Sequence, residues 1–349
     1  MTAGLAAAAG AVTTRQAAAA AEYLLVTVEQ SANQIQRWST ARSSWSGTPD
    51  WYWTAPARSG AWYGLSDVKR RLTANWDDVL VTCAGGTPKD GGRAAMVRES
   101  DGAIVWQTVV PGHPHAIERI DGHGAIVTAS ANARVFGQPV PDDPSTSQDE
   151  SDPDGKFEAG GGLNLFVPSS HGGLPPTSFA DSVSTGFPGA HGVLWDNDND
   201  LLLAIGKEEL RAYSLVTNGS GIITGLTRRA TLSFSGMGHD LQPDYSSGKI
   251  LYTVGGDGGN PDAGVWETTL VWNSTDAEWN FVTPTRVHTW WFIKSFSRLP
   301  DGKEFCVDAP SAEEWWSDRV GYYQDGAYGY SVRPGAKFYK ARFWSHVLS

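Results

Sequence analysis

The protein has 349 residues with a formal net charge of −11, and 40% of its residues are hydrophobic, which is enough for one large domain. The acidic charge argues against nucleic acid as a partner, because proteins that bind it need clustered lysine and arginine to displace counterions. No stretch approaches the roughly 18 apolar residues that indicate a membrane span. Many glycines and few long runs of helix-forming residues favour short strands and tight turns, so we predict an all-β protein.

The first 22 residues are rich in alanine and other small residues, and they are predicted to be a tail or the remnant of a secretory signal. The match to a signal is atypical because a basic n-region is missing. Two glycosylation sequons, at Asn218 and Asn273, fit a secreted glycoprotein. We therefore expect an extracellular protein whose single domain covers residues 23–349.

A short pattern recurs along this domain: a histidine or lysine, a short strand, a polar turn, and a second strand that ends in small residues. Each copy predicts a β-hairpin. The leading residues are about 46 to 55 positions apart, which is the period of a four-stranded propeller blade. One longer interval contains residues 141–162, a Pro, Ser, Asp and Gly segment that is predicted to be a flexible surface insertion. The copies are 68–85, 114–130, 189–206, 238–255, 293–309 and the truncated 339–344.

We therefore predict a β-propeller with six blades. A seventh blade in the Trp-rich segment 41–67 is one alternative, and a β-sandwich with chance similarities is another. The last copy, 339–344, ends before its second strand. Residues 22–40 are predicted to form two strands, and these are the parts that the last copy lacks. The N-terminal and C-terminal strands are therefore expected to pair and close the propeller.

The first strand of each propeller blade lines the central channel, so the leading residues are predicted to form a ring. Three ammonium groups and three imidazoles are costly together unless an anion compensates them, which predicts an anionic ligand. The alternative is that these side chains bind backbone carbonyls between blades or point to solvent. The predicted ring consists of Lys69, His115, His191, His239, Lys294 and Lys340.

Aromatic and cationic residues near the ring fit a sugar site. Trp290 and Trp291 offer flat faces for stacking on sugar rings, with blade packing as the alternative. Arg342 is placed to bind a carboxylate through two hydrogen bonds. The acidic segments 196–200 and 255–262 could chelate calcium, but hairpin turns are the favoured interpretation at these positions.

Four segments resemble a family of secreted propeller proteins from fungi and bacteria: PHAIERI at 114–120, GAHGVLWD at 189–196, GHDLQPD at 238–244 and YKARFW at 339–344. The resemblance extends to the L-rhamnose-α-1,4-D-glucuronate lyases, which trim rhamnose caps from gum arabic side chains, and it runs from Leu24 to Trp344. It implies a propeller with an active site on one face near the channel, histidine and arginine in leading roles, and calcium in the central funnel.

The same resemblance implies β-elimination at a glucuronate residue. An imidazole takes the C5 proton once cations neutralise the carboxylate, and a second acid protonates the departing oxygen. We expect a monomer that acts on an anionic oligosaccharide or polysaccharide; the alternative is a non-catalytic propeller that binds a glycan or a protein. The expected base and acid are His115 and His191, with His239 third, and the expected substrate-binding residues are Lys69, Lys294, Lys340, Arg342, Trp290 and Trp291.

Overall fold

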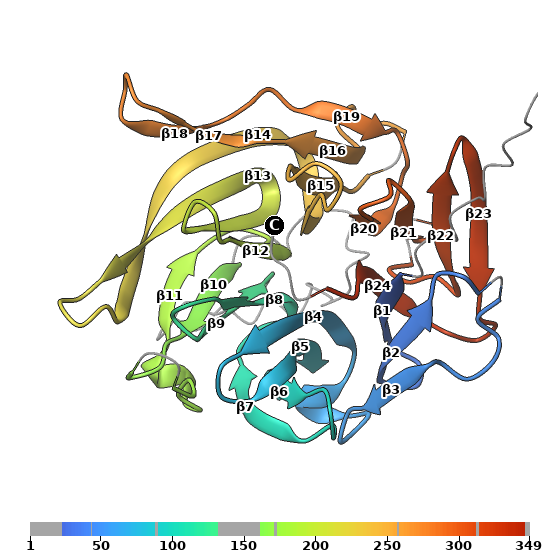
Figure 1. Cartoon of the computed structure of the whole chain (residues 1–349), viewed down its shortest axis with the longest axis horizontal. Coiled ribbons are helices and arrows are strands. Elements are labelled where there is room, and N and C mark those ends of the chain that lie inside the picture. Colours follow the sequence, from blue (N-terminus) through green and yellow to red (C-terminus); the bar gives the residue numbers. More distant parts are fainter. Residues whose placement is uncertain are drawn as a thin grey trace, which may run out of the picture.

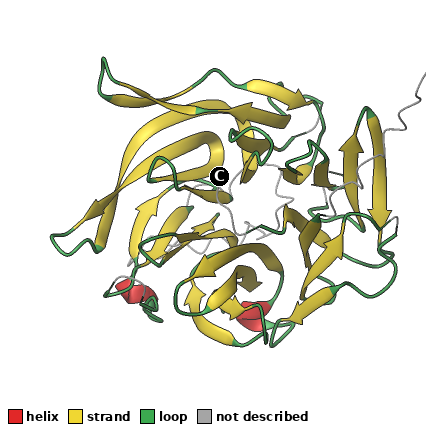
Figure 2. Cartoon of the chain, viewed as in Figure 1, coloured by secondary structure: helices red, strands yellow, loops and turns green. Residues whose placement is uncertain are grey.

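Strands make up nearly all the regular structure of the protein, and they form sheets arranged as a ring around a central axis (Figure 1). The computed structural model describes residues 23–42, 44–87, 90–131, 161–170, 173–256, 258–311 and 314–345. Within these residues the only helices are two single turns, η1 (Gly60–Trp62) and η3 (Phe179–Asp181) (Figure 2). The all-β prediction and the β-propeller prediction are therefore confirmed. The N-terminal tail and residues 141–160 of the expected insertion lie outside the described residues.

Four of the sheets have four strands each, in the orders β24-β1-β2-β3, β4-β5-β6-β7, β11-β10-β9-β8 and β20-β21-β22-β23. The first two comprise β24 (Phe338–Phe343), β1 (Leu24–Glu29), β2 (Gln34–Ser39), β3 (Trp51–Thr54), β4 (Leu65–Thr73), β5 (Asp77–Thr87), β6 (Gly91–Arg98) and β7 (Ile104–Val110). The other two comprise β8 (Pro114–Ile120), β9 (Ala125–Ser130), β10 (Gly162–Phe166), β11 (Val183–Gly186), β20 (Ile293–Arg298), β21 (Glu304–Asp308), β22 (Arg319–Gln324) and β23 (Ala327–Val332).

A fifth sheet has six strands, and a separate two-stranded hairpin projects beside it. The six strands are β12 (Gly192–Asp196), β13 (Leu201–Thr217), β14 (Ile223–Pro243), β15 (Ile250–Val254), β16 (Gly264–Thr268) and β19 (Thr285–His288). The hairpin consists of β17 (Leu270–Asn273) and β18 (Glu278–Phe281).

The predicted number of blades is wrong, because the large sheets number five in the described part of the chain. The long strand β14 is the physical reason. Its first part pairs with β13 and its last residues, Gly238–Pro243, pair with β15, so one continuous strand joins two ladders into one sheet. The segment 41–67 does not make a further blade either. It contains β3, the outer strand of the first sheet, and the short helix η1.

The first sheet contains strands from both ends of the chain. Strand β24 pairs antiparallel with β1, with Val28 opposite Lys340, and β1 continues into β2 and β3. The blue and red ribbons that meet at this sheet in Figure 1 are these two ends.

The core lies between the faces of adjacent sheets. Ala129 in β9, Leu163 in β10, Val193 in β12 and Leu202 in β13 are fully buried in one cluster that spans two sheets. Because both faces of each inner strand are covered, these strands are buried along most of their length rather than on alternate residues. Strands β8 and β9 are buried at every position.

The same kind of hydrogen bond links three pairs of neighbouring sheets and aligns their innermost strands along the central axis. The Asp67 carboxylate accepts the backbone N–H of Ile117 in the next sheet (3.1 Å), and the Asp240 carboxylate accepts that of Phe296 (3.3 Å). The Ser295 hydroxyl oxygen likewise accepts the backbone N–H of Ala341 (2.9 Å). A polar side chain near the start of one innermost strand therefore fixes the start of the next one.

Buried ion pairs add to these links at the centre of the ring. The Arg342 guanidinium lies 2.6 Å from the Asp67 carboxylate and 2.8 Å from the Asp240 carboxylate, and Lys340 lies 3.6 Å from Asp240. Burial by itself raises the pKa of Asp67, but Arg342, Lys340 and Lys69 outweigh it and hold that pKa below its usual range. These charges bind together strands from distant parts of the sequence.

We expect Arg342→Met to lower the free energy of unfolding by about 3–5 kcal/mol, because two buried carboxylates lose their guanidinium partner. The matched control is Arg98→Met, which breaks the exposed pair with Asp101 (2.9 Å) and should change the stability little, because water already screens this pair. Denaturant unfolding of both variants measures the difference. Equal losses in the two variants would show that the central ion pairs do not hold the sheets together.

Candidate functional site

Four histidines lie side by side at one end of the propeller, and we name them the histidine row: His113, His115, His191 and His239. The ring centroids of His113 and His115 are 4.5 Å apart, those of His115 and His191 are 3.8 Å apart, and those of His191 and His239 are 5.2 Å apart. The His115 and His191 rings are stacked, with an interplanar angle of 17°. The structure thus brings together the three predicted histidines and adds a fourth.

β-Bulges in the innermost strands explain how the row is built. The ladder register shifts around His115 in β8, around His239 in β14 and around Lys294 in β20. His191 comes directly before β12, and its backbone N–H donates to the carbonyl of Ile205 (2.9 Å). A bulge turns a side chain away from the regular alternation of a strand. The same irregularity therefore presents each of these side chains at the same end of the propeller.

The bulges also correct two members of the predicted ring. In β4 the shift falls at Ser66, three residues before Lys69, and in β24 the unmatched residue is Tyr339, one residue before Lys340. The sequence analysis placed the cationic residues Lys69 and Lys340 in the ring, whereas the residues at the bulges are the neutral Ser66 and Tyr339. The equivalent positions are Ser66, His115, His191, His239, Lys294 and Tyr339.

Tyr339 lies beneath the histidine row, in contact with its buried member His115. Its hydroxyl lies 3.0 Å from Nδ1 of His115, and both side chains are buried. The strand that carries Ser66, β4, lies between β24 and β8 in the ring (Figure 1). A small residue at Ser66 is consistent with Tyr339 reaching past β4 to the histidine.

Two of the three lysines that were predicted to bind a substrate carboxylate, Lys69 and Lys340, have partners inside the protein, and so does Arg342. Lys340 is fully buried and donates to the backbone carbonyls of His115 (3.0 Å) and His191 (3.4 Å). Lys69 is buried 3.1 Å from the Glu118 carboxylate. Together with the ion pairs of Arg342 described above, these contacts match the alternative that the sequence left open, in which such residues satisfy groups between blades.

Accessibility within the row runs opposite to the order expected from the sequence. His115 is fully buried and His191 is 5% exposed, whereas His113, His239 and Lys294 are half-buried. Groups at the surface can meet a ligand, so His239 and Lys294 replace His115 as the candidates for contact.

Two glycines make room for the outer members of the row. A Cβ atom at Gly255 would lie 2.3 Å from Nε2 of His239, and one at Gly85 would lie 2.1 Å from Cε1 of His113. Any larger residue at either position would displace an imidazole. The sequence analysis missed His113, although the sequence contained a signal for it. His113 stands two positions before His115, and Gly85, which makes room for its ring, is the last residue of the repeat copy 68–85.

The two predicted tryptophans differ in their surroundings. Trp290 stacks on His288 with centroids 3.7 Å apart and also packs against Tyr328, so it belongs to an aromatic cluster within the fold. Trp291 is 55% exposed and borders the loop that follows Gly255, because a Cβ atom at Gly258 would lie 3.1 Å from its ring. Only Trp291 of this pair offers an open aromatic face.

Three members of the row, His115, His191 and His239, are uncharged at neutral pH. Burial lowers the pKa of His191 to about 3; the Gly189 carbonyl opposes this change, and the positive charges of Lys340 and Lys294 add to it. Burial is also the main reason that the pKa values of His115 and His239 lie well below the ordinary value of 6.5, and neighbouring cations and histidines lower both further. Nδ1 of His191 lies 2.9 Å from the Gly189 carbonyl, which can only accept, so Nδ1 carries the proton and Nε2 is an acceptor.

Across the described residues, no group of three or more His, Cys, Asp or Glu side chains is arranged to hold a metal ion. The acidic segment 196–200 forms the turn between β12 and β13, where the Asp196 carboxylate accepts the backbone N–H groups of Asp198 and Asn199 (both 3.2 Å). Calcium in the funnel stays a prediction. Among the residues that the structure describes, no helix has the length and apolar character needed to cross a membrane.

Comparison with known proteins gives a fold likeness and no family. No protein-family model and no curated protein matches the chain. One similar structure is a humanized mutant of the Chaetomium thermophilum Polycomb Repressive Complex 2 bound to an inhibitor (TM-score 0.48, 8% identity, 89% of this chain and 66% of that one, just under two thirds of its length).

Two further structures are a functionally unknown protein from Desulfotomaculum acetoxidans (TM-score 0.44, 9% identity, 90% and 98% of the two chains) and a putative 6-phosphogluconolactonase from Bacteroides uniformis (TM-score 0.47, 11% identity, 92% and 99%). We draw no functional conclusion from likenesses at these values.

The neutral row predicts a loss of stability in mild acid. Below pH 6.5 the unfolded chain protonates His191, whereas the folded protein does so only near pH 3, so the unfolded state binds more protons in this window. The free energy of unfolding should therefore fall as the pH is lowered from 6.5 to about 5, before carboxylates titrate. Denaturant unfolding across this interval measures the slope, and His191→Gln should make it shallower. A stability that does not change over the interval would contradict a neutral row.

Proposed function

We propose that the protein is a glycan lyase that performs β-elimination at a uronate residue bound against the histidine row. The observation that carries this proposal is the row itself, in which uncharged imidazoles lie beside the ammonium group of Lys294. An uncharged imidazole can accept a proton, and a nearby cation can neutralise a carboxylate. These are the two groups that β-elimination next to a carboxylate requires.

His239 is the proposed base. It is half-buried at the end of the row, and its buried Nδ1 has no hydrogen-bond partner among the described residues, which fits a neutral ring. In the proposed step the imidazole takes the C5 proton, the electron pair forms the C4–C5 double bond, and the C4–O bond breaks. The imidazolium then returns its proton to the departing oxygen, so a separate acid is not needed.

Lys294 is the proposed partner of the uronate carboxylate. Its charge acts on both His191 and His239, which places it close to the base. A carboxylate that binds here brings a negative charge to imidazoles whose pKa values are held low by burial and by cations. The pKa values of these imidazoles should therefore rise when the substrate binds, so that His239 becomes a stronger base in the complex.

The substrate class follows from the site and from the family resemblance. The exposed face of Trp291, beside the loop after Gly255, suits stacking on a sugar ring. The resemblance to L-rhamnose-α-1,4-D-glucuronate lyases points to a glucuronate residue of gum arabic type, and to a protein that acts outside the cell.

A second candidate is a propeller that binds an anionic glycan without cleaving it. The strongly lowered pKa values favour this alternative, because an imidazole whose pKa is low in the free protein is a weak base. The two candidates share the same site and differ in whether an unsaturated product appears.

Incubation with gum arabic and with a panel of glucuronate-containing polysaccharides tests the lyase. We expect the ultraviolet absorbance of an unsaturated uronate to rise, and we expect His239→Ala and Lys294→Ala each to slow this rise by about a hundredfold or more. The matched control is Lys337→Ala, which removes an exposed lysine outside the site. Absence of an unsaturated product from every glycan would contradict the lyase and leave the binding alternative.

Proton uptake on binding is a separate expectation that does not require turnover. Near pH 6.5, a glucuronate oligosaccharide should bind with uptake of up to about one proton, because its carboxylate raises the pKa of the row. Calorimetric titrations in buffers of different ionisation enthalpy measure this uptake, and His239→Gln should reduce it. Binding without any proton uptake would mean that the carboxylate lies away from the histidines.

A further inference from the structure

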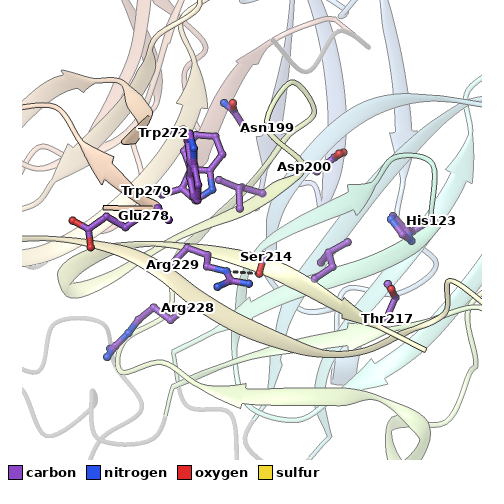
Figure 3. A pocket seen from close by; sticks show the side chains of 13 residues that line it. His123, Asn199, Asp200, Ser214, Thr217, Arg228, Arg229, Trp272, Glu278 and Trp279 are labelled. Carbon is purple, nitrogen blue, oxygen red and sulfur yellow. Dashed lines mark hydrogen bonds between the residues drawn. The ribbon is translucent and has the colours of Figure 1, made fainter. Parts of the chain in front are cut away.

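A second concave site lies at the opposite end of the propeller, and we name it the hairpin cleft. It is a cavity of about 670 Å³ between the β17–β18 hairpin and the outer parts of β13 and β14 (Figure 3). The turns that follow β8 and β12 contribute His123, Asn199 and Asp200 to its lining.

Chain direction separates this cleft from the histidine row. His115 stands at the start of β8, and His123 follows the end of that strand. His191 directly precedes β12, whereas Asn199 follows its end. A strand of seven residues spans roughly 20 Å, so the two sites lie at opposite ends of the same strands. The cleft is therefore not an extension of the proposed lyase site.

Two tryptophans form one wall of the hairpin cleft. Trp272 and Trp279 are cross-strand partners in the β17–β18 hairpin, and their ring centroids are 5.5 Å apart at an interplanar angle of 62°. Trp272 is 51% exposed. Exposure of so large an apolar ring to water is unfavourable in free energy, and a ligand that covers the ring removes this cost.

A β-bulge places two arginines on the same side of the cleft. Ala212 pairs with Ala230 and Tyr213 with Arg228, so Arg229 is the unmatched residue between them. Neighbouring residues of a regular strand point to opposite faces, whereas both arginines line this cavity. The Ser214 hydroxyl accepts a hydrogen bond from Nε of Arg229 (2.7 Å), which orients the guanidinium (Figure 3).

The polar lining is balanced in charge and rich in both donors and acceptors. Arg228 and Arg229 line the cavity together with the carboxylates of Asp200 and Glu278, and the Asn199 amide both donates and accepts. This balance gives no preference for a charged ligand. Sugar hydroxyl groups, which donate and accept at once, fit such a lining, and the apolar face of a sugar ring fits an open tryptophan.

We propose that the hairpin cleft binds an uncharged oligosaccharide, with one sugar ring stacked on Trp272 and its hydroxyl groups bound by Arg229, Asn199 and Asp200. A docking surface for a protein would be flatter and poorer in charged groups at its centre than this concave site. The cleft would hold a polysaccharide at one end of the propeller, independently of any reaction at the other end.

Native affinity electrophoresis tests this proposal with soluble galactan, β-glucan, xylan and mannan as the probes. The protein should be free of N-glycans, because the sequons at Asn218 and Asn273 flank the cleft. At least one probe should retard the protein, and Trp272→Ala should weaken that binding by about tenfold or more. The matched control is Val271→Ala, which removes a neighbouring side chain that is 43% exposed and does not line the cavity.

Each result has a defined meaning. Retardation that Trp272→Ala weakens by about tenfold or more and Val271→Ala leaves unchanged supports the proposal. Absence of retardation by all four probes, or retardation that Trp272→Ala does not alter, overturns it. A change in sedimentation of the Trp272→Ala protein would overturn it in favour of a protein contact. This experiment measures binding of neutral glycans, whereas the lyase assay measures cleavage of glucuronate-containing glycans. A negative result in either experiment therefore does not contradict the other proposal.

Discussion

The buried carboxylates of Asp67 and Asp240 are the constraint on which the rest of the structure depends. Each accepts a backbone N–H of the following sheet, and both bind the guanidinium of Arg342. Charges removed from water are tolerated only with close partners, so the geometry around them has little freedom. They fix the heights at which the innermost strands start, and these heights determine which residues face one another across the centre.

The histidine row is a consequence of that constraint. Because these strands are held at the same level, the bulge residues His115 and His239 and the residue before β12, His191, are presented at the same end. They become neighbours although they are far apart in the sequence. Burial then makes them neutral. Lys69, Lys340 and Arg342, which the sequence placed among them, are buried and bind carboxylates and carbonyl groups, whereas Lys294 is half-buried like His239.

The two ends of the propeller carry different chemistry. Histidines and a lysine gather where the innermost strands begin, and tryptophans, arginines and carboxylates gather beyond the ends of β8 and β12. In the two functions proposed above, the division would let a holding site for neutral sugars keep a polymer near a reacting site without competing for the same groups. The hairpin that carries Trp272 is separate from the large sheets, and Leu270 and Phe281 hold it on the core cluster beside β13 and β14.

The sequence by itself determined the all-β class, the propeller and the identity of three histidines in the row, because these depend on local patterns: apolar strands, turn residues and a regular spacing between copies. Only the tertiary structure decided which residues stand at equivalent positions. A bulge shifts the register by one residue without a mark in the hydrophobic pattern, so Tyr339 and Ser66 could not be told from Lys340 and Lys69. The fusion of two ladders through β14 and the pairing of buried charges were hidden for the same reason: each depends on which distant strands become neighbours, and residue type and spacing along one chain do not contain that information.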